Sequence, residues 1–308
     1  MAAAFTVTLR WFRKRFSLWS ILSLPGIAWL VLFFLAPLYV VLAIVFGAVD
    51  PTFRTPTPIW NPAHWRAGQF TYVIDRIFGS DAVFGPALLR TAIYVLAASV
   101  VCVTVAFPVA YYVARLSGRR KGLILALLIA PFWISYMMRM LAWVNLLADD
   151  GLVNKLLSFG GLFNVHEQWL SGKSIVVILG LVYGYVPYMI LPLYAGLDRL
   201  PQSVLEAARD LGANRARAFV RVVLPMCRPT IVAGVLLTCL PMLGDYYTND
   251  LLSGSPSTAM VGNLIDQTVL TPGETGYAGA FVMIVLVVSL IPMLYYVRSV
   301  AKSELTAT

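Results

Sequence analysis

Six long apolar segments constrain this chain more than any other feature of its sequence. They comprise residues 21–47, 86–114, 122–148, 174–197, 229–248 and 277–297. A helix needs about 20 mostly apolar residues to cross a hydrocarbon core about 30 Å thick, so each segment can span a membrane. Of the 308 residues, 60% are hydrophobic and only 12% are charged, which excludes an ordinary soluble enzyme. We predict an all-α membrane protein with six transmembrane helices, in which residues 1–308 form a single domain.

The distribution of basic residues predicts how the helices cross the membrane. With the N-terminus inside, sixteen of the 23 Lys and Arg residues fall on the inner side and seven on the outer side. Cytoplasmic loops of membrane proteins have such an excess. We therefore expect both termini and the long loop 198–228 to face the cytoplasm. The first apolar segment is longer than the core of a signal peptide, so we interpret it as an uncleaved anchor.

Side chains that could support catalysis or bind a metal are scattered along the chain. The cysteines and histidines are Cys102, Cys227, Cys239, His64 and His166. Residues 172–174 resemble the end of a phosphate-binding loop, but Glu167 occupies the position that requires glycine. We therefore predict no catalytic site, no metal site and no cofactor in this chain. The net charge of +9 is dispersed between apolar runs, which indicates contact with membrane lipid and no nucleic-acid partner.

Prolines and small residues occur inside the predicted helices. The prolines are Pro25, Pro37, Pro108, Pro131, Pro187, Pro192, Pro241 and Pro292. Each removes a helical hydrogen bond and either allows a bend or reflects only the general frequency of proline in membrane helices. Gly180 and Gly184 form a small-xxx-small pair, which favours close approach of another helix.

The loop 198–228 has the pattern of two short helices joined by a turn. Pro201 is expected to start the first helix, and Gly212 stands where a left-handed C-terminal cap would lie. Asn214 can cap the second helix, and Pro225 is expected to end it. The small surface of the first helix, beside a glutamate, suits insertion into a groove on another protein.

This loop resembles the cytoplasmic signature of permease subunits in ATP-binding-cassette importers. In that signature Glu-Ala-Ala is followed by Gly four residues on, and later by Leu-Pro. The matching residues are Glu206, Ala207, Ala208, Gly212, Leu224 and Pro225. Val222 stands where the family usually has isoleucine, which is a conservative departure. The resemblance implies the fold of a type I importer permease, with this loop as a coupling helix seated on an ATPase.

Residues 211–254 are also similar to the spermidine and putrescine branch of that family, as are residues 130–143 and 149–154. The resemblance implies a location in the cell inner membrane and a heterodimer with a second permease subunit. It further implies two cytoplasmic ATPase subunits, which bind ATP and Mg²⁺, and an extracytoplasmic substrate-binding protein.

Two charged residues are candidates for a translocation path or its gate. Arg139 lies about 17 residues into the third segment and Asp245 about 16 residues beyond the start of the fifth, or about 26 Å and 24 Å at 1.5 Å per residue. These matched depths allow the two charges to pair when the path is shut. The alternative is that Arg139 extends to the outer headgroups and Asp245 lies in an external loop.

Aromatic residues accompany both charges and are candidates for the same path. They are Trp133, Tyr136 and Trp143, at helical spacing around Arg139, and Tyr246 and Tyr247, beside Asp245. Aromatic faces and carboxylates can replace the water around an ammonium group. The aromatic stripe is equally typical of helix packing or of an interfacial belt.

Together these features predict the membrane subunit of an ATP-driven importer for a small cationic solute, with a polyamine such as spermidine or putrescine as the expected cargo. The alternative cargoes are an opine, an amino-acid derivative or a quaternary amine. Two alternatives from other classes are a stand-alone channel, which needs no ATPase, and a membrane scaffold, which needs no polar path.

Overall fold

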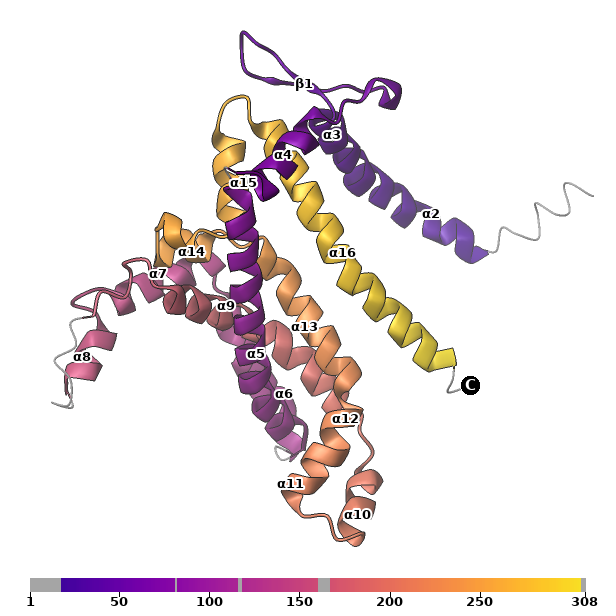
Figure 1. Cartoon of the computed structure of the whole chain (residues 1–308). Helices are drawn as coiled ribbons and strands as arrows, with labels where there is room; N and C mark the ends of the chain where they lie inside the picture. Colours follow the sequence, from indigo (N-terminus) through magenta and orange to yellow (C-terminus); the bar gives the residue numbers. More distant parts are fainter. Residues whose placement is uncertain (1–17, 81, 116–117, 160–166, 306–308) are drawn as a thin grey trace, which may run out of the picture. The chain divides into compact units, whose positions relative to one another are not determined.

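The computed structural model describes residues 18–80, 82–115, 118–159 and 167–305 (Figure 1). Its contacts group the chain into two units. One comprises Met1–Tyr72 with Val269–Ala280, and the other Val73–Thr268 with Phe281–Thr308. The expectation of one domain over residues 1–308 stays a prediction.

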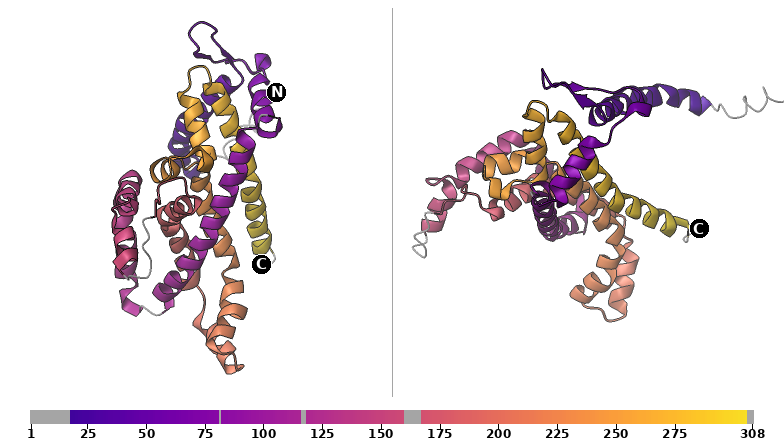
Figure 2. Two further views of the ribbon diagram at one scale, coloured as in Figure 1. Left: turned by 60° about the vertical axis from the view of Figure 1, so that its left-hand side comes forward. Right: turned by 45° about the horizontal axis from the view of Figure 1, so that its top comes forward.

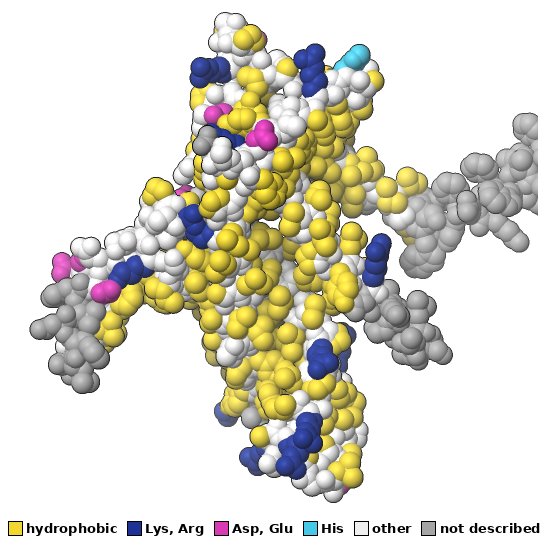
Figure 3. Space-filling model, viewed as in Figure 1, with side chains coloured by type: hydrophobic (Ala, Val, Ile, Leu, Met, Phe, Trp, Pro, Cys, Tyr) yellow, Lys and Arg dark blue, Asp and Glu magenta, His cyan; other side chains and the backbone are white. Residues whose placement is uncertain are grey.

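Membrane-spanning helices account for most of the described chain. Four are long and apolar enough by themselves: Leu22–Val45, Phe84–Arg115, Ser174–Asp198 and Thr275–Arg298. Two bent pairs of helices also pass, Gly118–Trp133 with Tyr136–Ser158 and Arg215–Met226 with Arg228–Leu243. Counted as one span each, the bent pairs bring the described chain to six spans. Hydrophobic side chains cover much of the surface in Figure 3, as expected for helices that face lipid.

The first unit contains the N-terminal span and a small sheet. The span consists of α2 (Leu18–Leu30), a π-helical turn η1 (Val31–Leu35) and α3 (Ala36–Val45). Strands β1 (Ala48–Val49) and β2 (Pro56–Thr57) pair antiparallel and are followed by the 3₁₀ turn η2 (Pro62–His64). Helix α4 (Gly68–Phe78) begins in this unit and continues into the second unit from Val73. The first turns of α16 (Thr275–Leu305) pack here, because Gly279 leaves room for the Val45 side chain.

The core of the second unit is formed by α5 (Phe84–Arg115), α9 (Ser174–Asp198) and α13 (Arg228–Leu243), which lie side by side in Figures 1 and 2. Large apolar side chains such as Leu181, Met189 and Met242 are fully buried between them. Gly234 admits the Met189 side chain, since a Cβ atom there would lie 2.8 Å from its sulfur.

The third predicted segment, 122–148, is not one helix. It divides into α6 (Lys121–Ile129), the 3₁₀ turn η4 (Ala130–Trp133) and α7 (Tyr136–Leu147), and the two halves are bent by 83°. The break follows Pro131, with Ile134 and Ser135 at ψ values of 139° and 138°, far from a helix. Depth counted along a straight helix therefore does not apply to Arg139. The segment continues into α8 (Leu152–Phe159).

The fifth predicted segment, 229–248, is also shorter than expected. Helix α13 ends at Leu243, and a turn at Gly244 leads to the separate helix α14 (Tyr247–Leu252). Asp245 lies in that turn, which changes the chain direction and leads on through η6 (Pro256–Thr258) to α15 (Val261–Leu270).

Candidate functional sites: a buried carboxylate and an exposed helical hairpin

Asp245 is buried and is held by neutral hydrogen-bond donors. Its side chain has only 6% of its surface exposed. The carboxylate accepts hydrogen bonds from the Tyr136 hydroxyl at 2.6 Å, the Thr248 hydroxyl at 2.7 Å and the Thr248 N–H at 2.9 Å. These donors come from α7 and α14, and Tyr185 of α9 packs against Tyr136 with 5.7 Å between ring centres, so three helices meet at this site.

Three glycines allow these elements to approach each other. A Cβ atom at Gly184 would lie 2.5 Å from the Tyr136 ring, and one at Gly180 would lie 2.6 Å from the Thr248 methyl group. A Cβ atom at Gly262 would lie 2.7 Å from the Asp245 carbonyl oxygen. The small-xxx-small pair of α9 therefore packs directly against the residues that bind Asp245.

Arg139 does not pair with Asp245 in this structure. The ion pairs in the described part of the chain join Lys121 to Asp198 and Lys173 to Glu167. The Arg139 guanidinium lies 4.6 Å from the centre of the Phe132 ring and within 6 Å of the rings of Tyr136 and Tyr183. Its Nε atom donates to the Ile134 carbonyl oxygen at 3.2 Å.

The Arg139 guanidinium also keeps an unused donor. The side chain is 8% exposed, and its buried Nη1 atom has no hydrogen-bond partner among the described residues. Tyr136 connects the two charges, since its ring faces Arg139 and its hydroxyl bonds to Asp245. The site therefore holds a buried cation near the ring of Tyr136 and a buried anion at its hydroxyl.

The other aromatic candidates are divided between this site and the surface. Trp143 packs edge-on against Tyr183, 5.4 Å between ring centres, next to Arg139. Trp133 lies before the break in the third segment and is 86% exposed, so it does not share a helix face with Tyr136. Tyr246 and Tyr247 stack on each other at 4.1 Å and are not part of the buried hydrogen-bond network around Asp245.

Sequence reasoning missed Tyr183, Tyr185 and Thr248. The tyrosines of α9 were visible as a cluster at 183, 185 and 188, and Thr248 follows Asp245 by three residues. Neither pattern identifies a site alone, because the carboxylate meets them only through helix packing.

The exposed hairpin of residues 198–228 forms the second candidate site. Helix α10 (Gln202–Asp210) begins directly after Pro201, and Gly212 has a φ of +80° as a left-handed cap. The Asn214 side chain caps α11 (Arg215–Ala218) by accepting the Arg217 N–H at 2.8 Å. All three features were predicted from the sequence.

Pro225 does not end the second helix of the hairpin. A π-helical turn, η5 (Phe219–Val223), precedes α12 (Leu224–Met226), and the helical run ends at Cys227 with a 64° bend into α13. The π-helical turn directly before Pro225 changes the hydrogen-bond pattern there, so that the helical run accommodates a residue without an N–H.

The hairpin presents small and charged residues to its surroundings. Glu206, Ala207 and Gly212 are exposed, whereas Ala208 and Val222 are half-buried. A cavity of about 440 Å³ lies between α10 and α11, lined by Leu205, Arg209 and Phe219 among others. Lys and Arg side chains gather at this end of the chain in Figure 3.

A helical bundle with bent membrane spans, a buried charge cluster and a protruding hairpin defines a membrane permease. Residues 103–302 match the family described as "Binding-protein-dependent transport system inner membrane component". The chain belongs to this family. It is a multi-pass inner-membrane transport subunit and not an enzyme.

Curated relatives and solved structures agree with that assignment. The spermidine/putrescine transport system permease protein PotB of Haemophilus influenzae is 32% identical over 87% of this chain and 90% of its own length. The inner membrane ABC transporter permease protein YdcU of Escherichia coli is 34% identical over 67% and 70%. In a crystal structure of a bacterial alginate ABC transporter, bound to an alginate pentasaccharide-loaded periplasmic protein, one chain has the same fold. Its TM-score is 0.69, at 18% identity over 91% of this chain and 92% of that one.

Gly184→Val is expected to lower transport activity about tenfold while the protein still inserts and assembles. The new side chain displaces the Tyr136 ring, which breaks a hydrogen bond to a buried charge, an interaction of roughly 1.5–3 kcal/mol. Uptake by membranes with matched protein levels measures the effect. Gly122→Val is the control, because nothing lies within 4 Å of a Cβ atom there. Equal uptake activity of the Gly184→Val and Gly122→Val variants would show that transport does not require the position of the Tyr136 ring.

Proposed function

We propose that this chain is one of two different membrane subunits of an ATP-driven importer for an aliphatic polyamine. The buried Asp245 carboxylate, held only by neutral donors, is the observation that most supports a cationic cargo. A carboxylate that has left water without a paired cation favours an ammonium group at that position. The relatives named for spermidine and putrescine transport support the same class of cargo.

The hairpin supports coupling to a separate ATPase. Its exposed residues Glu206 and Ala207 lie on the short helix α10, which begins after Pro201 and is followed by the turn at the exposed Gly212. A short helix of this kind can insert into a groove and pass a movement to α13 through the bend at Cys227. In this proposal two cytoplasmic ATPase subunits bind ATP and Mg²⁺, and a substrate-binding protein delivers the cargo from outside.

A second candidate cargo is a solute with both an ammonium and a carboxylate group, such as an amino-acid derivative or an opine. The specific observation in its favour is Arg139, whose Nη1 atom is buried beside the Asp245 cluster without an acceptor among the described residues. A carboxylate could accept from Arg139 while an ammonium group met Asp245.

Uptake into proteoliposomes containing the complete transporter tests the proposal. Radiolabelled spermidine and putrescine should accumulate only with ATP inside and binding protein outside. Accumulation of an amino-acid derivative or opine, but of neither polyamine, would replace the first cargo by the second. Flux without the ATPase would instead indicate a channel.

The proposed orientation places the hairpin in the cytoplasm and residues 149–173 outside. In a variant without native cysteines, an impermeant thiol reagent added to intact cells should label Ser171→Cys and leave Ser203→Cys unlabelled. Both serines are exposed in the structure, so accessibility differs only through the membrane. The opposite labelling pattern would invert the orientation. Ser117, in the predicted inner loop before the third span, lies outside the described residues.

A further inference from the structure

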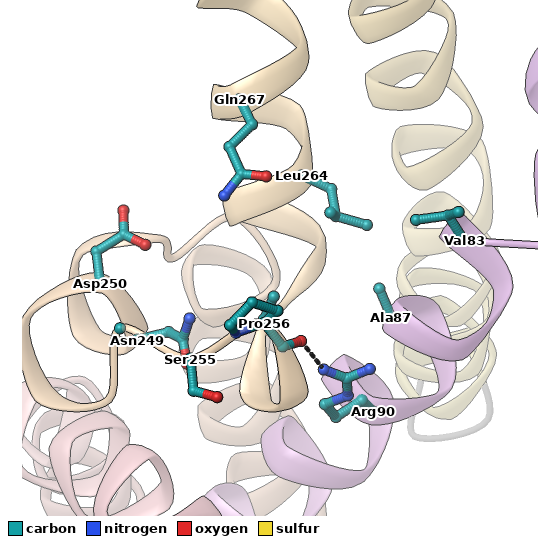
Figure 4. A pocket seen from close by; sticks show the side chains of 11 residues that line it. Val83, Ala87, Arg90, Asn249, Asp250, Ser255, Pro256, Leu264 and Gln267 are labelled. Atoms are coloured by element: carbon teal, nitrogen blue, oxygen red, sulfur yellow. Dashed lines mark hydrogen bonds between the residues drawn. The ribbon is translucent and has the colours of Figure 1, made fainter. Parts of the chain in front are cut away.

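Another cavity, not lined by Asp245, lies between the start of α5, the helix α14 and the segments that follow α14 (Figure 4). Its volume is about 330 Å³. The lining residues used below are Val83, Ala87, Arg90, Asn249, Asp250, Ser255, Pro256, Leu264 and Gln267. All of them belong to the second structural unit.

Asn249 offers this cavity an unused acceptor. The residue is 2% exposed, and its Oδ1 atom has no hydrogen-bond partner among the described residues. In Figure 4 its amide group points toward Ser255 and Pro256. A buried acceptor without a donor is unfavourable, so a ligand that donates a hydrogen bond there is stabilised by it.

The charge around Asn249 favours a cation as that donor. The neighbouring Asp250 carboxylate accepts from the Asn263 side chain at 2.7 Å. Partial burial raises the pKa of Asp250, the hydrogen bond from Asn263 lowers it, and the negative charges of Asp266 and Asp245 raise it. These two neighbouring negative charges also favour an external cation beside Asp250.

The rest of the cavity limits the shape of such a ligand. Val83, Ala87 and Leu264 provide aliphatic walls. Arg90 lies on the opposite side from Asp250 in Figure 4, and its guanidinium donates to the Pro256 carbonyl oxygen at 2.9 Å. A second ammonium group at the Arg90 side would be repelled, so the cavity suits one ammonium group on an aliphatic stem.

We propose that this cavity binds the primary ammonium end of an aliphatic amine, with Asn249 Oδ1, the Asp250 carboxylate and the Ser255 hydroxyl as its acceptors. An ammonium group has three donors, and each of these groups can accept from one of them; the Ser255 oxygen, which lies 2.8 Å from the Ser257 hydroxyl, keeps a lone pair for this. The site is separate from the Asp245 cluster, and it rests on the proposed function only in the choice of an amine as ligand. In a diamine, the second ammonium group extends out of the cavity.

Cysteine protection tests the site without requiring transport. The full chain with Gln267→Cys, in a background without native cysteines, is placed in lipid nanodiscs and treated with N-ethylmaleimide. Gln267 is exposed and lines the cavity, so its modification rate reports occupancy. We expect n-butylammonium and putrescine to slow modification similarly, and neither butan-1-ol nor potassium chloride of equal ionic strength to do so. Ser158→Cys, exposed on α8, is the control position.

Two substitutions then test the acceptors. Asn249→Leu and Asp250→Asn should each raise the n-butylammonium concentration for half-protection about tenfold, the loss expected for one charged hydrogen bond. Asp250 is exposed, so Asp250→Asn gives a result even if the Asn249→Leu variant, altered at a buried position, does not fold. Unchanged protection in Asp250→Asn, protection by butan-1-ol, or equal protection at Ser158→Cys would each overturn the site.

Different results would contradict the proposed function and the proposed amine site. Polyamine uptake without any protection at Gln267→Cys would overturn the second site and leave the proposed function intact. Protection in nanodiscs by a transporter that imports no polyamine would overturn the proposed function and leave the amine site intact. Protection by putrescine but not by n-butylammonium would overturn the single-ammonium assignment.

Discussion

Asp245→Asn is expected to reduce polyamine uptake at least tenfold while the complex still assembles. The substitution preserves shape but removes the negative charge to which the Tyr136 and Thr248 hydroxyls both donate. The asparagine amide can accept from fewer of these donors, and its own NH₂ group faces hydroxyls that had donated to Asp245. Hydrogen bonds to a charged group contribute roughly 1.5–3 kcal/mol, which corresponds to tenfold or more in a rate or affinity.

Initial rates of uptake against polyamine concentration measure this effect. Asp149→Asn removes a negative charge at an exposed position and is the matched control. If the Asp245→Asn variant takes up polyamine at the wild-type rate and with the wild-type affinity, the charge of Asp245 is not needed for transport and the residue has only a structural role. Because Arg139 and Asp245 do not pair here, the swapped variant Arg139→Asp with Asp245→Arg should not restore activity. Recovery would show that the two charges meet in another conformation.

Gly212→Val is expected to abolish coupling to the ATPase while insertion in the membrane is unchanged. Gly212 has a φ of +80°, where a β-branched side chain is strained by about 1–2 kcal/mol. The cap also positions two hydrogen bonds, from the Gly212 N–H to the Arg209 carbonyl and from the Ala213 N–H to the Ala208 carbonyl. Losing this turn would turn α10 away from its place beside α11.

The reason for this sensitivity is conformational, since no atom lies within 4 Å of a Cβ atom built on Gly212. Gly212→Asn should therefore retain most of the coupling, because asparagine adopts left-handed conformations more readily than other residues. Co-purification of the ATPase and substrate-stimulated ATP hydrolysis measure both variants. Equal loss in the Asn and Val variants would indicate that the docked ATPase excludes any side chain at this position.

Local signals in the sequence were sufficient to predict where the helices of the hairpin of residues 198–228 begin and where the turn between them lies. Pro201, Gly212 and Asn214 act through their own backbone preferences, which need no distant partner. The end of the second helix was predicted wrongly at Pro225, because a π-helical turn allowed the chain to continue. In this turn Phe219 packs edge-on against Phe107 and Tyr111, and the sequence of the hairpin alone does not predict such contacts with α5.

The candidate site was predicted only in part. Asp245 and Tyr136 were identified because a charge and an aromatic residue are conspicuous in apolar segments. Their hydrogen bond was not predicted, since straight third and fifth helices would put Arg139 and Asp245 at similar depths, where they either pair or lie at the outer surface. The breaks after Pro131 and at Gly244 turn Tyr136 toward Asp245 and leave Arg139 among aromatic rings.

The sequence by itself determined the membrane location, the number of apolar segments and the caps of the hairpin, because hydropathy, length and backbone preference are properties of consecutive residues. Only the tertiary structure decided where two spans break and which side chains surround Asp245. Those outcomes depend on close contacts between segments far apart in the chain, such as Gly184 of α9 against Tyr136 of α7 and Gly262 of α15 against the Asp245 backbone. The pattern of apolar residues within one helix does not predict which face of another helix it packs against.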